Sequence, residues 1–470
     1  MHEHDVDIEA LTEAIVRYSV ERVRLDQPPL DQSMSYAALY ELAGETITAD
    51  GLGGLEALRV FEDVLAPATI SVDHSKFLSF VPAAPTEASI LFDLVVGASS
   101  IYAGSWLEGA GAVFAENQAL RWLADLVGLP PSAGGVFVSG GTGGNLSALI
   151  AARYEWRRLS GGRNDRVRGL MLTSNGSHSS IASAARAMDA DLIRVTADER
   201  GRMSGQALQD TVDMLAPADR DRLFVIIATA GTTNAGVIDD LDGAGQIAAD
   251  LGVWFHVDGA YGAAALCSPT MRPKFAGIER CDSFIVDPHK WLFAPFDCCA
   301  LLYRDPHIAQ AAHTQHAEYL DVLHGEAESN FGVVREMNPS DYAHHLSRRA
   351  RGLPFWFSLA TYGTDEYAKS VDITMAVTAG AADLIRAAEH VELLTEPDLS
   401  VLLFRRIGWS PTEYQAWSDR ALLSGEAFVV PTTWNGETVL RFCFVNPLTT
   451  VEQVAEILDS MLESDDRMAG

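Results

Sequence analysis

A histidine and a lysine stand side by side at residues 289 and 290, directly after a short apolar segment and a proline. Lys290 is one of only four lysines among the 34 basic residues of the chain. An arginine guanidinium stays protonated in proteins, whereas a lysine amine in a dry pocket can lose its proton and attack a carbonyl. Lys290 is therefore a candidate Schiff-base lysine, and the alternative is a surface lysine at a strand end.

A second reactive group is Asp258, which follows the apolar segment 254–257. A carboxylate at the end of a buried strand is costly unless a positive charge lies beside it. The protonated ring nitrogen of pyridoxal phosphate would be such a partner, and the small Ala260 would let the ring lie flat. The alternative is a helix cap or a structural ion pair.

Three further turns follow apolar segments and carry glycines, hydroxyls or a histidine. Gly140, Gly141 and Thr142 precede a predicted helix, where backbone N–H groups can bind an anion. This pattern is a weak signal alone, and it lacks the GK[ST] ending of an NTPase loop. His178 could stack on a flat ring or cap a helix, and Thr233 lies in the third turn.

These turns require a scaffold that brings strand ends together. Short apolar segments alternate with helical stretches, which is typical of a doubly wound α/β fold with a mostly parallel sheet. Ligands bind at the carboxyl ends of the strands in such folds. We predict seven strands, at residues 135–138, 170–173, 192–195, 223–228, 254–257, 284–286 and 299–303.

The flanking regions have different patterns. An amphipathic helix over residues 8–25 and two helices within 35–66 favour a dimerisation arm. Helices are expected at 88–98 and 112–127, at 371–390, and after the capping box of Thr450 and Gln453. Strands are expected at 401–405, 427–431 and 439–445. We therefore predict an N-terminal arm (1–75), a large cofactor-binding domain (76–350) and a small C-terminal α+β domain (351–470).

Composition limits the possible partners. The net charge of −30, without a basic stripe, argues against nucleic acid and anionic membranes. No apolar run is long enough to span a bilayer, and the acidic start does not resemble a secretory signal, so we expect a cytoplasmic protein. The five cysteines have no metal-ligand spacing and are expected to be reduced core residues, so no metal site is predicted.

Taken together, these motifs resemble the group II pyridoxal-phosphate-dependent amino-acid decarboxylases, which include aromatic-amino-acid, glutamate, cysteine-sulfinate and 2,4-diaminobutyrate enzymes. The resemblance runs from about residue 74 to residue 446, and it includes the 32-position spacing between Asp258 and Lys290. It is carried by the segments 139–142, 178–180, 229–233, 256–261 and 287–291.

The resemblance implies a fold-type-I homodimer, with an aspartate-aminotransferase-like large domain and active sites near the subunit interface. Lys290 would hold the pyridoxal phosphate covalently, with His289 beside the cofactor. The other implied contacts are His178 stacked on the ring, Asp258 at the ring nitrogen, Ala260 on the opposite face, Gly140, Gly141 and Thr142 at the phosphate, and Thr233 at the cofactor or the substrate carboxylate.

The implied reaction is loss of CO2 from an amino acid, followed by protonation of Cα and release of the amine. Family members commonly use a loop tyrosine as the proton donor, and its replacement is associated with oxidative deamination to an aldehyde. In the corresponding loop, 319–343, the tyrosine position falls near Pro339, so Tyr342 is the candidate donor, with helix-start packing as the alternative. Asp287 also departs from the pattern, because aromatic-type members have an asparagine there.

Substrate choice depends on residues that in the family line the pocket, partly from the other subunit. Phe80, Tyr102 and Trp106 lie in those segments and suit a bulky apolar or aromatic side chain, although they could equally be dimer core. We expect an aromatic L-amino acid. The alternatives are an acidic or diamino acid substrate, or an oxidative route to an aldehyde.

Overall fold

The chain is built around a seven-stranded sheet with the order β1-β7-β6-β5-β4-β2-β3, and the computed structural model describes residues 6–317 and 336–468. Only β7 runs antiparallel to its two neighbours. All seven predicted strands are confirmed, with ends within two residues of those expected. The strands are β1 Gly134–Val138, β2 Leu170–Ser174, β3 Asp191–Val195, β4 Leu223–Thr229, β5 Trp254–Asp258, β6 Ser283–Val286 and β7 Cys299–Tyr303.

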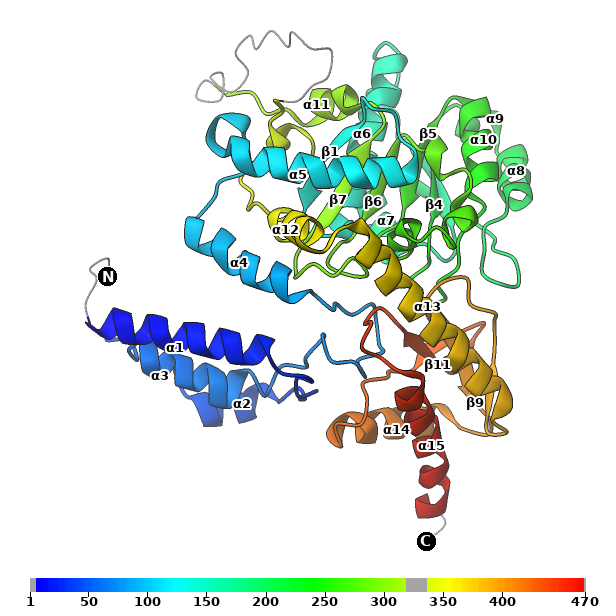
Figure 1. Ribbon diagram of the computed structural model, residues 1–470. Coiled ribbons are helices and arrows are strands. Elements are labelled where there is room, and N and C mark those ends of the chain that lie inside the picture. The colour runs from blue at the N-terminus through cyan, green and yellow to red at the C-terminus, as the bar shows by residue number, and fades with distance from the viewer. Residues whose placement is uncertain (1–5, 318–335, 469–470) are drawn as a thin grey trace.

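Helices cover both faces of this sheet (Figure 1). Alternate residues of β4 belong to different apolar clusters, with Ile226 in the larger cluster and Val225 in the second. Burial on both faces explains why the inner strands are mostly apolar, whereas the edge strand β3 carries Asp191 and Arg194. The helices and the 3-10 helix that follow or precede the strands are α5 Trp106–Val127, α6 Gly141–Leu159, α7 Ser179–Ala187, α8 Gly205–Met214, α9 Pro217–Arg220, α10 Leu241–Leu251, η2 Gly262–Cys267 and α11 Pro306–His313.

A second, antiparallel sheet of four strands lies near the C-terminus, in the order β10-β11-β9-β8. The predicted strand at 427–431 is wrong: Phe428 forms only an isolated bridge with Phe77, and the strand begins after Pro431. Proline cannot donate to a strand ladder, which accounts for the shift. The elements of this region are α12 Leu353–Tyr362, α13 Thr364–Ala387, β8 Val391–Leu393, β9 Val401–Arg406, α14 Pro411–Leu423, β10 Thr432–Trp434, β11 Glu437–Cys443 and α15 Val451–Met468.

The helix α13 contacts both sheets. Tyr367 and Val371, in its first half, belong to the apolar cluster of the large sheet, whereas Ala381 and Ile385 pack with the small one. Leu78 also packs with the small sheet, although it lies at the start of the range predicted for the large domain. The proposed boundaries at residues 75 and 350 stay predictions.

The N-terminal helices lie side by side, away from the large sheet (Figure 1). They are α1 Val6–Val23, α2 Tyr36–Ala43 and α3 Gly54–Val60, followed by the π-helical turn Phe61–Leu65 and then α4 Glu87–Ser99. The helix α5 begins at Trp106, six residues earlier than expected, because the Ser105 hydroxyl accepts a hydrogen bond from the backbone N–H of Glu108 (3.2 Å) and caps the helix. Trp106 therefore belongs to a helix and not to the expected loop.

All five cysteines are buried and unpaired, as the sequence predicts. Within residues 6–317 and 336–468, no helix combines the length and apolar character that a bilayer crossing requires. The same described residues contain no group of three or more His, Cys, Asp or Glu side chains that could hold a metal ion.

Candidate active site

A cavity of about 340 Å³ opens at the carboxyl ends of β4, β5 and β6, where the doubly wound fold predicts a ligand site. Each of the predicted cofactor-binding residues lines it. These residues are Gly140, Gly141, Thr142, His178, Thr233, Asp258, Ala260, His289 and Lys290. The sheet topology thus brings together side chains that lie up to 150 positions apart in the sequence.

The turn before α6 forms one wall of the cavity. The helix begins at Gly141, so the free backbone N–H groups of its first turn, together with the positive end of the helix dipole, can bind an anion. A Cβ atom added to Gly141 would lie 3.3 Å from both Ala260 Cβ and Asp287 Oδ2. A side chain at this position would therefore crowd the lining of the cavity.

Asp258 ends β5 and is 3% exposed. Its Oδ2 accepts a hydrogen bond from Asn145 Nδ2 (2.9 Å), and its Oδ1 accepts one from the backbone N–H of Ala260 (3.1 Å). These two bonds fix the carboxylate without neutralising it, because neither donor is charged. The carboxylate is therefore available for a cationic ligand atom.

Asn145 is a site residue that the sequence interpretation missed. Its Oδ1 accepts from His256 Nε2 (2.8 Å), while His256 Nδ1 pairs with the Ser283 hydroxyl (2.8 Å), which accepts from Trp254 Nε1 (2.8 Å). Burial lowers the pKa of His256 to about 4, so this imidazole stays neutral. The chain of bonds orients the Asn145 amide so that its NH2 group faces Asp258.

His178 is the N-cap of α7 and also lines the cavity. Capping the helix therefore does not prevent this residue from contacting a ligand. Its Nδ1 accepts from the backbone N–H of Ser180 (3.2 Å) and pairs with the Ser180 hydroxyl (2.8 Å). The same hydroxyl accepts from Asn145 Nδ2 (3.0 Å), so it donates its own proton to His178. Because Nδ1 accepts these bonds, Nε2 is the ring nitrogen that carries a hydrogen.

Lys290 lies next to a buried carboxylate, with 2.9 Å between its Nζ and Asp287 Oδ2. Burial alone would lower the pKa of Lys290, but the Asp287 carboxylate raises it above the ordinary value. Burial would likewise raise the pKa of Asp287, but the nearby Lys290 ammonium holds it below its usual range. The two residues therefore form an ammonium and carboxylate pair.

His289 lies on the other side of this carboxylate, with 3.6 Å between its Nε2 and Asp287 Oδ2. Its Nδ1 accepts a hydrogen bond from the backbone N–H of Cys298 (3.0 Å), so the neutral ring has its proton on Nε2. Burial lowers the pKa of His289 despite the nearby Asp287. The imidazole can therefore donate one hydrogen bond into the cavity as a neutral group.

The structure does not place Tyr342 in this cavity. Tyr342 is buried in the second apolar cluster, and its hydroxyl makes no hydrogen bond to the described residues. Its carbonyl accepts from the Tyr303 hydroxyl (3.1 Å). This arrangement favours the packing alternative, while residues 318–335 of the candidate loop lie outside the described part of the chain.

The three predicted substrate-pocket residues also do not line the cavity of their own chain. Tyr102 bridges to Arg349 and Trp106 begins α5, so both are tied to the surroundings of that helix. Phe80 is 59% exposed, and its carbonyl accepts from Arg441 (2.6 Å), which also donates to the carbonyl of Thr233 (2.9 Å). Their role in a pocket shared between subunits stays a prediction.

Two residues at the cavity mouth were not predicted. Phe296 is 53% exposed, and its ring centroid lies 4.8 Å from that of His289. Asp297 pairs with Arg351. Their sequence signal is weak, since they follow the lysine in a segment without a strand pattern.

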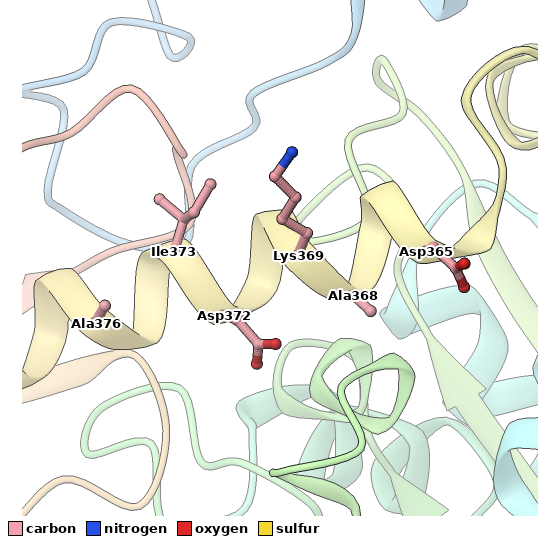
Figure 2. Close-up of a pocket in the computed structure, with 6 residues that line it drawn as sticks. All are labelled: Asp365, Ala368, Lys369, Asp372, Ile373 and Ala376. Atoms are coloured by element: carbon pink, nitrogen blue, oxygen red, sulfur yellow. The ribbon is translucent and has the colours of Figure 1, made fainter.

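Other hollows in the described residues do not gather these groups. Figure 2 shows one of them, a hollow of about 480 Å³ over one face of α13, with Lys369 pointing away from the helix. It is lined by Asp365, Ala368, Lys369, Asp372, Ile373 and Ala376. These residues all come from one helix face, so they do not surround a ligand with reactive or binding groups from several elements.

The donor set of the cavity fits the cofactor that the sequence predicts. The α6 turn offers backbone donors for a phosphate, Asp258 offers a carboxylate for a protonated ring nitrogen, and Lys290 offers an amine for an aldehyde. The space beside Gly141, which a Cβ would fill, lies between these groups. The residues present thus fit pyridoxal phosphate.

Comparison with known proteins agrees with this geometry. The pyridoxal-dependent decarboxylase conserved domain matches residues 54–407. An aromatic-L-amino-acid decarboxylase of Bacillus atrophaeus is 30% identical over 92% of this chain and 90% of its own length. An L-2,4-diaminobutyrate decarboxylase of Rhizobium meliloti (strain 1021) is 32% identical over 84% of this chain and 78% of its own length. The crystal structure of Oryza sativa TDC with PLP and tryptamine covers 100% of both chains with a TM-score of 0.89 at 23% identity, and so shares the fold.

Proposed function

The chain belongs to the family of pyridoxal-dependent decarboxylases, and we propose that it converts an aromatic L-amino acid into its amine and CO2. It is a pyridoxal-phosphate-dependent amino-acid decarboxylase. The observation that supports the assignment of residues is the single cavity where the α6 turn, Asp258, His178 and Lys290 meet.

We assign the cofactor contacts from this geometry. The backbone N–H groups of residues 140–142 bind the phosphate, and His289 donates to it from Nε2. Asp258 would hold a proton on the ring nitrogen, while His178 and Ala260 would lie on the two faces of the ring. Lys290 supplies the amine that bonds to the aldehyde carbon.

When bound, pyridoxal phosphate supplies a ring that accepts the electron pair left behind by the departing CO2. The residues of the chain determine which bond of the substrate breaks and where protons go. Asp258 would keep the ring nitrogen protonated, and Thr233 would orient the substrate carboxylate. His178 holds a proton on Nε2 at the cavity, where it can assist protonation of Cα.

The charge of the cavity supports a substrate without an acidic side chain. Among the described residues that line it, Lys290 is the one with a full positive charge, and no arginine is present. Glutamate or cysteine sulfinate would need a donor for a second acidic group. Phe296, at the mouth, offers a face on which a flat side chain can stack.

A diamino acid is the second candidate. Three carboxylates, Asp258, Asp287 and Asp297, line the cavity, and no donor for a second acidic group is needed for a cationic side chain. The relative that acts on L-2,4-diaminobutyrate is as similar to this chain as the aromatic-amino-acid relative. An oxidative route that yields an aldehyde is the remaining alternative for the reaction.

Product analysis tests these proposals. The purified protein, loaded with cofactor, is incubated with each protein amino acid and with diaminobutyrate and cysteine sulfinate, and products are measured by mass spectrometry. An aromatic amine together with CO2 is the expected result. A diamine product would change the substrate class, an aldehyde with ammonia and peroxide would change the reaction, and a keto acid would indicate transamination.

We also propose that the protein is a cytoplasmic homodimer. Apolar side chains remain exposed on α4 (Leu91, Leu94 and Val95) and on α5 (Leu107 and Phe114), which is typical of a subunit interface. The N-terminal helices add further exposed apolar residues, namely Ile8, Ile15 and Val16 of α1 and Tyr36, Tyr40 and Leu42 of α2.

Light scattering after size-exclusion chromatography tests the dimer. The wild type is expected to have twice the mass of the 50.8 kDa chain. Leu94→Asp should produce monomers, because a charge would be buried in the interface. Leu423→Asp, at a residue of α14 that is 66% exposed, is the matched control and should leave the mass unchanged. A monomeric wild type would contradict the proposal.

A further inference from the structure

Asp287 lies where it can interact with both Lys290 and the anion-binding turn. It follows β6 directly and is 2% exposed, and its backbone N–H donates to the carbonyl of Ala260 (3.0 Å) while its carbonyl accepts from the N–H of Lys290 (2.9 Å). Its Oδ2 lies 2.9 Å from Lys290 Nζ and would lie 3.3 Å from a Cβ on Gly141. The carboxylate is therefore fixed between the lysine and the phosphate-binding turn.

The other carboxylates of the cavity have partners of their own. Asp258 accepts two hydrogen bonds, from Asn145 and Ala260, and Asp297 pairs with Arg351. Asp287 Oδ1, in contrast, makes no hydrogen bond to any described residue, and Lys290 is the positively charged group nearest to this side chain. A buried carboxylate without a cation would be strongly destabilising.

The remaining groups around Lys290 do not offer a competing counter-ion. His289 keeps its proton on Nε2 as a neutral ring. On β7, burial raises the pKa of the Cys299 thiol well above its ordinary value, so the thiol is neutral. Asp258 adds a weaker, more distant negative charge from β5. Lys290 and Asp287 thus form a distinct pair within the site.

We propose that Asp287 is the counter-ion of Lys290, a positioning residue that keeps the lysine nitrogen positively charged both as a free ammonium and after it has bonded to the cofactor. The proposal rests on the proposed function, since it needs Lys290 to be the cofactor-bonding residue. It also explains why a carboxylate is tolerated beside a phosphate-binding turn: the lysine charge offsets it.

The charge balance of the bonding step agrees with this role. A lysine ammonium and an aldehyde give a protonated carbon–nitrogen double bond and one water molecule, so the nitrogen keeps one positive charge throughout. A carboxylate within about 6 Å of that nitrogen would stabilise its positive charge. The protonated form is the more electrophilic one, so Asp287 would keep the site reactive toward a substrate amine at higher pH.

The absorbance of the bound cofactor, which depends on protonation of the Lys290 nitrogen, tests the proposal without an activity assay. Spectra of the loaded protein are recorded from pH 5 to pH 10. Loss of the charge in Asp287→Asn should lower the midpoint of the spectral transition by about one unit or more. Asp297→Asn removes a carboxylate at the mouth of the same cavity that pairs with Arg351, and should shift the midpoint by less than about 0.3 units.

Asp287→Glu and Asp287→Gln provide a second comparison if the asparagine variant does not fold or load. The glutamate variant should have the higher midpoint of the two. Equal midpoints in the wild type and Asp287→Asn, or in Asp287→Glu and Asp287→Gln, would overturn the counter-ion role. Borohydride reduction separates this failure from that of the proposed function: a wild type in which no cofactor becomes attached to Lys290 would overturn both.

Discussion

Asn145 donates a 2.9 Å hydrogen bond from its Nδ2 to Asp258 Oδ2 and a 3.0 Å bond to the hydroxyl of Ser180, which in turn bonds to His178. One amide therefore positions both the carboxylate proposed to pair with the cofactor ring and the imidazole proposed to stack on it. Asn145 lies on α6, the helix that begins with the proposed phosphate-binding turn. Asp258 and His178 are therefore both linked, through Asn145, to the same rigid helix.

Asn145→Leu keeps the approximate volume of the side chain but removes these bonds. We expect kcat/KM to fall by about 10- to 100-fold, because replacing a residue that orients a ligand-contacting side chain has effects of this size. Cofactor retention on dialysis should fall as well. Gln246→Leu, an exposed substitution on α10, is the control and should change neither quantity. Unchanged retention in Asn145→Leu would contradict the proposed coupling.

Lys290→Arg retains a positive charge next to Asp287 but removes the primary amine. We expect activity to fall by about 1,000-fold or more, since a guanidinium stays protonated and cannot bond to the aldehyde. Borohydride reduction followed by mass spectrometry should find no cofactor attached to the chain. Lys369→Arg, on the exposed face of α13 that Figure 2 shows, should behave as the wild type. Activity close to wild type in Lys290→Arg would show that another residue bonds the cofactor.

Gly141→Ala tests the phosphate-binding turn. The new Cβ would lie 3.3 Å from Ala260 Cβ and Asp287 Oδ2, in the space assigned to the ligand, so we expect cofactor affinity to fall by about tenfold, or roughly 1.4 kcal/mol. Gly143→Ala is a matched control in the same turn, because its Cβ would be 3.7 Å from the nearest atom, Ser139 Oγ. Fluorescence titration with pyridoxal phosphate measures both. Equal affinities in the two variants would place the phosphate elsewhere.

Tyr342→Phe distinguishes packing from proton donation. The hydroxyl is buried without a hydrogen bond to the described residues, so its removal should raise the melting temperature or leave it unchanged. We expect kcat within about threefold of wild type and the same amine product, because proton donation contributes about 100-fold or more. A fall in kcat of that size, or an aldehyde product, would instead identify Tyr342 as the donor.

The residues that could be predicted from the sequence are those that directly follow a buried strand. Lys290, Asp258 and His178 lie at strand ends, and the convergence of parallel strands at one edge places them together whatever the details of packing. Asn145 could not be found in this way, because it lies inside a helix and acts through the direction in which its amide points. The position of Trp106 was missed for a similar reason, since the cap at Ser105 depends on a single local hydrogen bond.

The sequence also could not show which neighbours a given side chain contacts. Tyr342 was chosen by counting back from an arginine-rich segment. In the structure its ring is buried in the second apolar cluster. The pairing of Asp287 with Lys290 likewise could not be predicted from the sequence, although the unusual aspartate itself could be recognised. Sequence position identified a departure there, and only the 2.9 Å separation gave it a physical meaning.

Three histidines with lowered pKa values should make the protein sensitive to mild acid. Burial lowers the pKa of His256, His313 and His345 to about 4, whereas each would titrate near 6.5 in the unfolded chain. Between these two values the unfolded state binds more protons, so the free energy of unfolding falls as the pH decreases from about 6.5 to about 4. Each histidine contributes up to about 3 kcal/mol to this loss, at 1.36 kcal/mol per unit.

Asp239 opposes the effect, since burial raises its pKa to about 7 and its folded state therefore gains stability on acidification toward pH 4. Three histidines outweigh one aspartate, so we expect the melting temperature to decrease between pH 6.5 and pH 4. His313→Gln removes one of the titrating groups and can still donate to the carbonyl of Ser147, which His313 Nε2 contacts at 3.0 Å. Its melting temperature should depend less steeply on pH than that of the wild type. An equal slope would show that His313 has the same pKa in the folded protein as in the unfolded chain.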